Sequence, residues 1–222
     1  MYTTLILGVI TPALKQALIA LSFLFATQSD TTQTDKTMNT SPEITTATTW
    51  NIDTAHTQVE FVVKHMMFAK VRGAFTSFTG QIVAGEDGDL ANGQFMANIE
   101  TASVFTNNEQ RDGHLRSGDF FDSENFPAIT FNSSRIERVA EDKLKVYGQL
   151  TIKDVTKTIT LDVTVTGTGV DPWGNLRIGI QATGTIDRKA FGLTWNQALE
   201  AGGVLVGDEV QLVIEAQAVQ AN

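Results

Sequence analysis

Residues 158–166 read TITLDVTVT, with an apolar side chain at every odd-numbered position and threonine or aspartate at every even one. Residues 176–183, LRIGIQAT, repeat the alternation with apolar side chains at the even-numbered positions. Successive side chains of a β-strand point to opposite faces of its sheet, so this pattern predicts strands with one wet face and one buried face. Both segments therefore favour sheet over helix.

The same alternation recurs along residues 50–220 and predicts about eight strands. One short helix is expected to interrupt them, beginning at the capping pattern TNNE of residues 106–109 and ending near Phe120. We expect the apolar row at residues 210–214 to pair with the first strand, because closure removes exposed sheet edges. The predicted fold is all-β with one short helix, in which about eight antiparallel strands either form two stacked sheets or one sheet closed into a barrel.

The first 26 residues differ in composition from the rest of the chain. Apolar runs at residues 5–10 and 17–26 are separated by a short interval that contains a proline and a lysine. An apolar run of about ten residues after a basic residue is typical of a secretory signal peptide, whereas a membrane span needs about twenty. We therefore predict a signal peptide at residues 1–26, with an uncleaved anchor over residues 5–26 as the alternative.

Residues 27–49 are rich in threonine and serine and contain few side chains that a core could bury. Such a segment cannot offset the entropy lost on ordering, so we predict a disordered linker. Residues 50–222 then form one domain, since barrels and sandwiches commonly exceed the usual domain length.

Charge and cysteine content narrow the classes of partner. The 222-residue chain carries a net charge of −9 and has no cysteine. Without disulfides, the core alone must hold the domain together. The negative charge, with no lysine or arginine cluster, argues against nucleic acid or an anionic membrane surface as the main partner. Small molecules and other proteins remain.

The side chains expected to face the barrel interior combine bulky apolar residues with small ones such as Gly73, Gly148 and Ala182. Small residues among phenylalanines leave an apolar slot, which suits apolar ligands. The alternative is a filled barrel or a sandwich in which the glycines only ease the twist. His65 shares the inward parity and is predicted to contact a ligand head group at the barrel mouth. The residues predicted by parity to line the slot are Phe61, Val63, Phe75, Phe78, Phe95, Ile99, Val146, Ile178 and Ile180.

Three histidines, His56, His65 and His114, raise the question of a metal or catalytic site, because imidazole is a common zinc ligand. They show no tight ligand spacing, and the sequence contains no cysteine and no nucleophile elbow. Arg111 and Asp112 precede His114 on the expected helix, where we expect them to brace the loop over one barrel end. We therefore predict no catalytic site, no bound metal and no cofactor.

Four motifs follow one another along the predicted domain. They are Trp50-x-x-Asp53-x-x-His56, Arg111-Asp112-x-His114-Leu115, Gly148-x-Leu150-Thr151-Ile152-Lys153 and Arg188-x-x-Phe191-Gly192-Leu193-x-Trp195. In this order and at these spacings, they resemble the YceI-like polyisoprenoid-binding proteins. The resemblance covers residues 50–219.

This resemblance implies an elongated eight-stranded antiparallel barrel of lipocalin-like form with one short helix. Members of the family are often exported to the periplasm and hold a long isoprenoid or a similar amphiphile. It adds Arg188 and Trp195 of the fourth motif to the predicted ligand-binding residues. Ala190 departs from the family pattern, in which an acidic residue usually stands there, and this departure takes an expected partner from Arg188.

Three functional hypotheses follow. The first is a periplasmic or secreted carrier or scavenger that shields a polyisoprenoid, an isoprenoid quinone or a similar long-chain lipid, and that contacts membranes transiently to exchange it. The second is an exported redox accessory or enzyme, linked to a metal or haem, that uses His56, His65 or His114. The third is a filled barrel that acts only as a protein-interaction module. The sequence leaves the identity of the lipid and the formation of a homodimer open.

Overall fold

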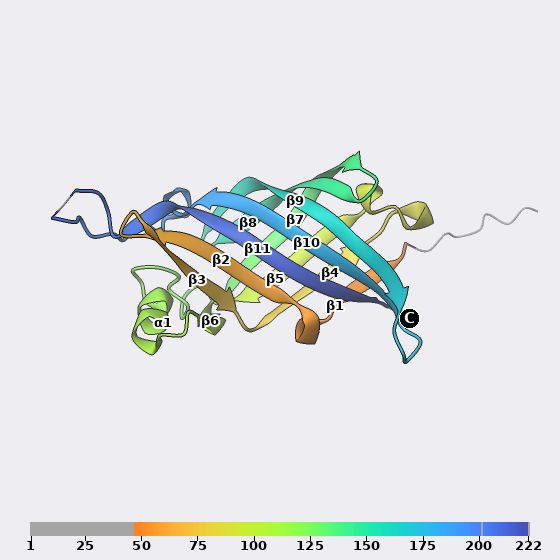
Figure 1. The fold of residues 1–222 in the computed structure, drawn as a ribbon, viewed down its shortest axis with the longest axis horizontal. Coiled ribbons are helices and arrows are strands. Elements are labelled where there is room, and N and C mark those ends of the chain that lie inside the picture. Colours follow the sequence, from red (N-terminus) through yellow and green to blue (C-terminus); the bar gives the residue numbers. More distant parts are fainter. Residues whose placement is uncertain (1–46, 201, 222) are drawn as a thin grey trace, which may run out of the picture. The chain divides into compact units, whose positions relative to one another are not determined.

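The computed structural model describes residues 47–200 and 202–221, which form a β-barrel (Figure 1). The predicted signal peptide and nearly all of the predicted linker fall within residues 1–46, outside the described residues. None of the helices in the described ranges is long and apolar enough to cross a bilayer. The first strand begins at Thr49, one residue before the predicted start of the domain.

The barrel and its ends are built from strands, one α-helix and short 3-10 turns. The strands are β1 (Thr49–Ile52), β2 (Gln58–His65), β3 (Ala69–Phe75), β4 (Phe78–Val83), β5 (Gln94–Glu100), β6 (Val104–Phe105), β7 (Ala128–Ala140), β8 (Lys143–Ile152), β9 (Val155–Val170), β10 (Leu176–Asp187) and β11 (Val206–Gln220). The α-helix is α1 (Glu109–Arg116), and the 3-10 turns are η1 (Thr54–His56), η2 (Glu86–Gly88), η3 (Leu90–Asn92), η4 (Thr101–Ser103) and η5 (Arg188–Phe191).

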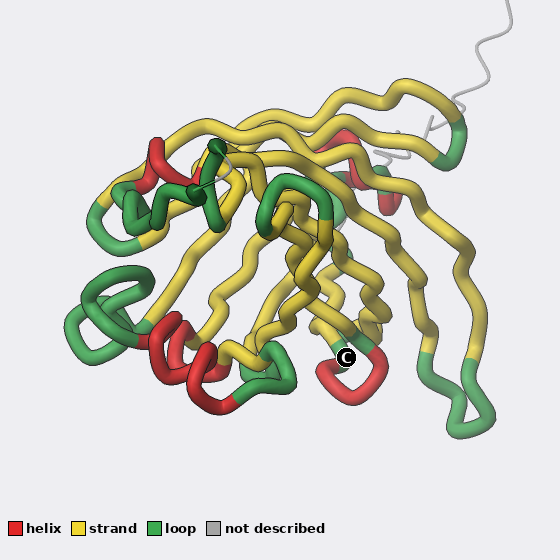
Figure 2. The backbone as a smooth tube through the Cα atoms, turned by 60° about the vertical axis from the view of Figure 1, so that its left-hand side comes forward, coloured by secondary structure: helices red, strands yellow, loops and turns green. Residues whose placement is uncertain are grey.

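Two pairs of short strands each complete one strand position of a closed, eight-stranded antiparallel barrel (Figure 2). β1 and β2, separated by η1, both pair with β11, towards opposite ends of that strand. β3 and β4 are separated by Thr76 and Ser77. β3 pairs with β2, whereas β4 pairs with β1 and with β5. The predicted closure of the last strand against the first is confirmed.

The interruption at Thr76 and Ser77 comes from a slip in the alternation, because Phe75 and Phe78 both border the interior although they differ in parity. The chain bends here, so that β3 diverges from β5. Among the described residues, positions 69–73 of β3 pair with β2 on one side and have no strand on the other. β6 and α1 lie beside this edge (Figure 1).

Large apolar side chains fill one end of the barrel, which we call the plugged end. The turn between β9 and β10, residues 171–175, and the C terminus lie at this end (Figure 1). The side chains come from the starts of β1, β8 and β10, from the end of β11, from the residue after β4 and from η3, and they belong to one buried cluster that extends beyond the cavity wall. They belong to the buried residues Trp50, Ala84, Leu90, Leu144, Ile178 and Ala218.

The opposite end carries α1, the loop at residues 117–127 and the β2–β3 hairpin, and we call it the helix end. The helix ends at Arg116 instead of near Phe120, because consecutive turns replace it there. Asn108 is its N-cap, and its side-chain oxygen accepts a hydrogen bond from the main-chain N–H three residues on, at 2.9 Å. Thr106, the predicted cap, instead hydrogen-bonds the buried Asp112, which braces the loop as expected.

Two glycines expected to open the interior are covered by aromatic rings. A β-carbon at Gly73 would lie 2.3 Å from Cζ of Phe61, and one at Gly148 would lie 2.4 Å from Cζ of Phe131. Glycine lets each ring lie flat against the sheet, as in the aromatic covering of glycine in other sheets. The prediction that these two positions leave space is therefore wrong, because neighbouring rings occupy it.

Candidate functional site

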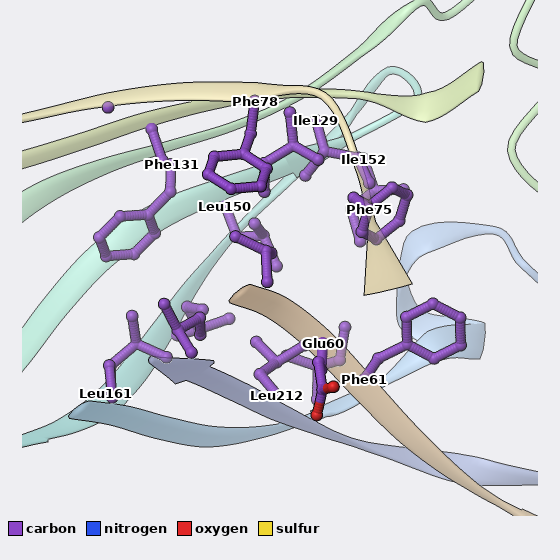
Figure 3. Close-up of a pocket in the computed structure, with 18 of the residues that line it drawn as sticks. Glu60, Phe61, Phe75, Phe78, Ile129, Phe131, Leu150, Ile152, Leu161 and Leu212 are labelled. Carbon is purple, nitrogen blue, oxygen red and sulfur yellow. The ribbon is translucent and has the colours of Figure 1, made fainter. Parts of the chain in front are cut away.

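The barrel encloses a cavity of about 260 Å³. Its wall includes residues from every strand except β6, and from α1. Figure 3 shows Phe78, Phe131 and Leu150 on one side and Leu161 and Leu212 on the other, with the space between them. This volume is slightly below the usual range for small-molecule sites, roughly 300–1,000 Å³.

The wall is apolar because the alternation directs polar side chains outward. Glu60 belongs to the border of the cavity, but its carboxylate accepts a hydrogen bond from Arg72 at 3.0 Å on the outer face. Gln81 likewise donates to the side-chain oxygen of Asn51 at 2.9 Å. Among the described residues, Glu60 and Arg188 are the charged ones that border the cavity. The space therefore suits hydrocarbon, since a polar ligand would lose hydrogen bonds to water without replacement.

Aromatic rings and the helix complete the wall at the helix end, where the strands of the barrel finish. The ring centroids of Phe61 and Phe75 lie 5.8 Å apart, and those of Phe75 and Phe121 lie 5.6 Å apart. Phe121 comes from the loop after α1, and Leu115 comes from α1 itself. The closure of the cavity at this end thus depends on a helix and a loop instead of a continuous hydrogen-bonded sheet.

Arg188 borders the cavity, but its guanidinium is held by the main chain. The residue is 3% exposed. Its N–H groups donate hydrogen bonds to the carbonyl oxygens of Leu193, Trp195, Val206 and Gly207. Asp208 lies 3.5 Å from Nη2 and supplies an acidic partner in place of the one expected at position 190. Burial lowers the pKa of Arg188, and the Asp208 carboxylate opposes that shift. The side chain anchors the segment that follows η5.

Trp195 lies outside the cavity wall, in an aromatic cluster with His114 and Phe120. The centroid of Trp195 is 4.7 Å from that of His114 and 5.5 Å from that of Phe120. Nε2 of His114 lies 2.8 Å from Oδ2 of Asp119. Because Phe120 also borders the cavity, the cluster packs α1 and the segment after η5 around the cavity end.

The first sequence motif forms an ion-pair cluster outside the cavity. Asp53 accepts a hydrogen bond from Nη1 of Arg177 at 2.6 Å and lies 2.8 Å from Nδ1 of His56. Asp171 accepts a hydrogen bond from Nε of Arg177 at 2.8 Å. These hydrogen bonds from Arg177 hold the pKa of both carboxyl groups below the usual range. The cluster ties η1 to β10 and to the turn at residues 171–175.

All the lining residues predicted by parity border the cavity except Ile178, which fills the plugged end. Of the other predicted ligand-binding residues, Arg188 borders the cavity, whereas His65 and Trp195 do not. His65 is half-buried at the end of β2, where it pairs with Val206 of β11. The roles of these residues in ligand binding remain predictions.

Several wall residues were missed by reasoning from sequence. Leu115, Phe120 and Phe121 border the cavity from the helix and its following loop, where no alternating pattern exists. Leu161 and Leu212 lie on strands and share the inward parity, so the same rule identifies them once it is applied to β9 and β11.

The three histidines lie at separate places in the fold. His56 is in η1, His65 is at the far end of β2, and His114 is in α1. Within residues 47–200 and 202–221, no group of histidine, aspartate and glutamate side chains is arranged to hold a metal ion. The positions of the histidines therefore give no support to the metal-linked hypothesis.

Comparison with known proteins gives a consistent result. The model of the YceI-like domain matches residues 50–218. A UPF0312 protein of Staphylococcus aureus strain USA300 is 40% identical over 171 residues, which cover 77% of this chain and 96% of the relative.

Solved structures share the architecture. BcnA of Burkholderia cenocepacia has a TM-score of 0.65 and 28% identity, and the match covers 75% of this chain and 98% of BcnA. The Campylobacter jejuni YceI protein has a TM-score of 0.61 and 29% identity, over 72% of this chain and 90% of that one. A polyisoprenoid binding domain from Saccharophagus degradans has a TM-score of 0.57 and 16% identity, and the match covers 78% of this chain and 98% of the domain. At this identity the match shows the fold alone. With its barrel matched from the first strand to the last, the chain belongs to the YceI-like family.

Proposed function

We propose that this protein binds the hydrocarbon chain of a long isoprenoid lipid inside the barrel and shields it from water. The observation that carries the proposal is the apolar wall of the 260 Å³ cavity, which ends at the plugged end and reaches the helix end. Each buried methylene group gains about 0.8 kcal/mol relative to water, so a chain in the cavity gains affinity from hydrocarbon alone. The wall offers a polar ligand few hydrogen-bond partners.

The isoprenoid class rests on the resemblance of the sequence motifs to the family. The domain of Saccharophagus degradans is described as polyisoprenoid-binding, but at 16% identity it supports the fold and not the ligand. The ligand class must therefore be tested on this chain, by comparing a branched isoprenoid with a straight chain of similar length.

A carrier role follows from the energetics of exchange. In a cell envelope the competing phase is a membrane, and moving hydrocarbon from one apolar phase to another changes the free energy little. A barrel of this kind exchanges its lipid with membranes instead of trapping it. The predicted signal peptide supports a periplasmic or secreted location for this exchange. We expect no catalytic activity, because Glu60 and Arg188, the charged residues bordering the cavity within the described chain, are engaged by Arg72 and by main-chain carbonyls.

The test is native mass spectrometry on protein expressed from the full chain and purified without detergent, before and after solvent extraction. A discrete lipid mass released from the folded protein is the expected result. Farnesol is then expected to rebind the extracted protein more tightly than dodecanol. Protein that carries no lipid after incubation with membranes, and that fails to bind farnesol, would favour the filled-barrel interaction module. The same spectra show whether residues 1–26 have been removed and whether the protein is a homodimer.

A further inference from the structure

The tip of the β2–β3 hairpin exposes three apolar side chains at the helix end. Met66, Met67 and Phe68 are 38%, 52% and 81% exposed, respectively. We call these three residues the hairpin tip. Contiguous exposed apolar side chains of this kind mark interaction sites more often than isolated ones do.

The backbone of the hairpin tip adopts a conformation that its residues disfavour. Met66 and Met67 have positive φ angles of 50° and 68°, and the N–H of Phe68 donates a hydrogen bond to the carbonyl of His65. A hairpin turn with positive φ at both central residues favours Asn-Gly, because L side chains are disfavoured there. Methionine at both positions raises the cost of the turn and leaves apolar side chains partly exposed to water, which indicates a role beyond closing the hairpin.

The hairpin tip lies next to strand residues of the cavity wall. The N–H of Met66 donates to the carbonyl of Leu205 at 2.8 Å, which fixes the tip against the start of β11. Val63, close to the tip on β2, and Val206, close to it on β11, both border the cavity. The β3 edge at residues 69–73, which has no strand on its outer side in the described chain, begins directly after the tip. A lipid leaving the cavity at this end would therefore emerge beside the tip.

Two lysines flank the tip on the outer face of the barrel. Lys64 and Lys70 are directly opposite each other on β2 and β3, and both are exposed. Within the described residues neither forms an ion pair. Like charges facing each other across a strand pair destabilise the pairing, and an external anion relieves that repulsion. Apolar side chains next to basic ones form the pattern that binds an anionic lipid surface.

We propose that the hairpin tip inserts among the lipids of an anionic membrane, with Lys64 and Lys70 against lipid phosphates, and that cavity lipid is exchanged beside it. The proposal rests on the proposed function and names the surface through which it operates. The chain's net charge of −9 repels an anionic membrane at a distance, so this docking is local and brief, as lipid exchange requires.

Insertion can be measured at single positions, because the chain has no cysteine and one introduced cysteine is then the only site of labelling. Phe68→Cys and Trp173→Cys, each labelled with the polarity-sensitive fluorophore NBD, are compared on vesicles of phosphatidylcholine and phosphatidylglycerol. Trp173 is the matched control, since it is 80% exposed on the turn at the plugged end. The label at position 68 is expected to brighten and shift to the blue, and the label at position 173 is not. Equal responses at the two positions would overturn the proposal. A response of the label at position 68 when unlabelled protein is added instead of vesicles would also overturn it.

Exchange is tested with a tip variant, Met66→Asn, Met67→Gly and Phe68→Ser together. The variant is expected to take up farnesol from vesicles at least tenfold more slowly, because it loses several buried apolar groups on docking. Its equilibrium affinity for farnesol in solution is expected to stay unchanged. Lys64→Gln and Lys70→Gln are each expected to weaken binding to the anionic vesicles about fivefold and to leave binding to phosphatidylcholine unchanged.

These readouts separate the two proposals. If no form of the protein binds farnesol in solution, the proposed lipid-binding function fails, whatever the labels report. If farnesol binds but the tip variant takes it up from vesicles as fast as the wild type, the proposal for the hairpin tip fails and the lipid-binding function stands.

Discussion

Replacing Ala182 by leucine is expected to fill part of the cavity and weaken ligand binding while the barrel stays folded. Ala182 is buried in β10, and its cross-strand neighbours are Val163 on β9 and Ile214 on β11. All three residues border the cavity, so a longer side chain extends from the wall into the space. Gly148 is less suitable for this purpose, because Phe131 already covers it.

The size of the effect follows from the added atoms. Leucine adds three carbon atoms, and at about 0.8 kcal/mol per buried methylene they stabilise the empty barrel by up to about 2.4 kcal/mol. A ligand that loses the same space loses the same contacts, which corresponds to a roughly 50-fold increase in Kd. Stability and affinity are therefore expected to change in opposite directions.

Urea unfolding measures the stability, and equilibrium dialysis with radiolabelled farnesol measures the affinity. Thr183→Leu is the matched control, because it adds apolar bulk at the neighbouring exposed position on the outer face of β10. This control is expected to bind farnesol as the wild type does. If Ala182→Leu folds and binds farnesol with wild-type affinity, the ligand does not occupy the cavity and the reasoning is refuted.

Three further substitutions test the structure. Gly73→Ala is expected to lower the unfolding free energy by about 1–3 kcal/mol, because its β-carbon would collide with the ring of Phe61. Gly113→Ala, in open space on α1, is expected to raise the unfolding free energy by up to about 1 kcal/mol. Urea unfolding that ranks the two variants the other way contradicts this account. Arg188→Ala is expected to destabilise the fold by about 3 kcal/mol or more and to expose residues 192–205 to proteolysis, since buried carbonyls lose their hydrogen-bond donors. Full resistance of the variant to protease would argue against the role of Arg188 as an anchor of this segment. The hydrogen bond from Arg177 lowers the pKa of Asp171 in the folded protein. The stability that Asp171 contributes is therefore present above its unfolded pKa of about 3.9 and is lost as the pH falls below that value. Asp171→Asn is therefore expected to flatten the decline of unfolding free energy between about pH 4 and pH 2, and an unchanged slope would assign the acid sensitivity to other groups.

The face on which each strand residue lies could be predicted from sequence, because the period of two is a local property of the chain. Phe61 and Ile180 border the cavity as their parity indicates. Depth along the barrel could not be predicted in this way. Ile178 is two residues from Ile180 on the same face, yet it lies in the plugged end. Its depth depends on pairing with Ala218, a neighbour that alternation does not identify.

Contacts between distant segments also escaped prediction. Phe121 completes the cavity wall from a loop without periodicity, and only tertiary packing positions it. The space above Gly73 is filled by a ring from the neighbouring strand, which requires knowledge of the register. Arg188 was associated with the ligand through its motif, but its hydrogen bonds go to a segment whose path the sequence pattern does not reveal.

The pairing of β11 with β1, β2 and β10 governs the order in which the barrel can assemble. Thr57 and Gln217 exchange hydrogen bonds across a separation of 160 positions in the chain. Contacts of such long range slow folding, because a large loop must close before any of them forms. The hairpins of β7 to β10 join strands close in sequence and can form early. β1 and β2 can pair with β4 and β3, respectively, but each lacks its second partner until β11 is available. In a chain exported from its N terminus, as proposed here, this arrangement keeps the barrel open until its last strand has crossed the membrane.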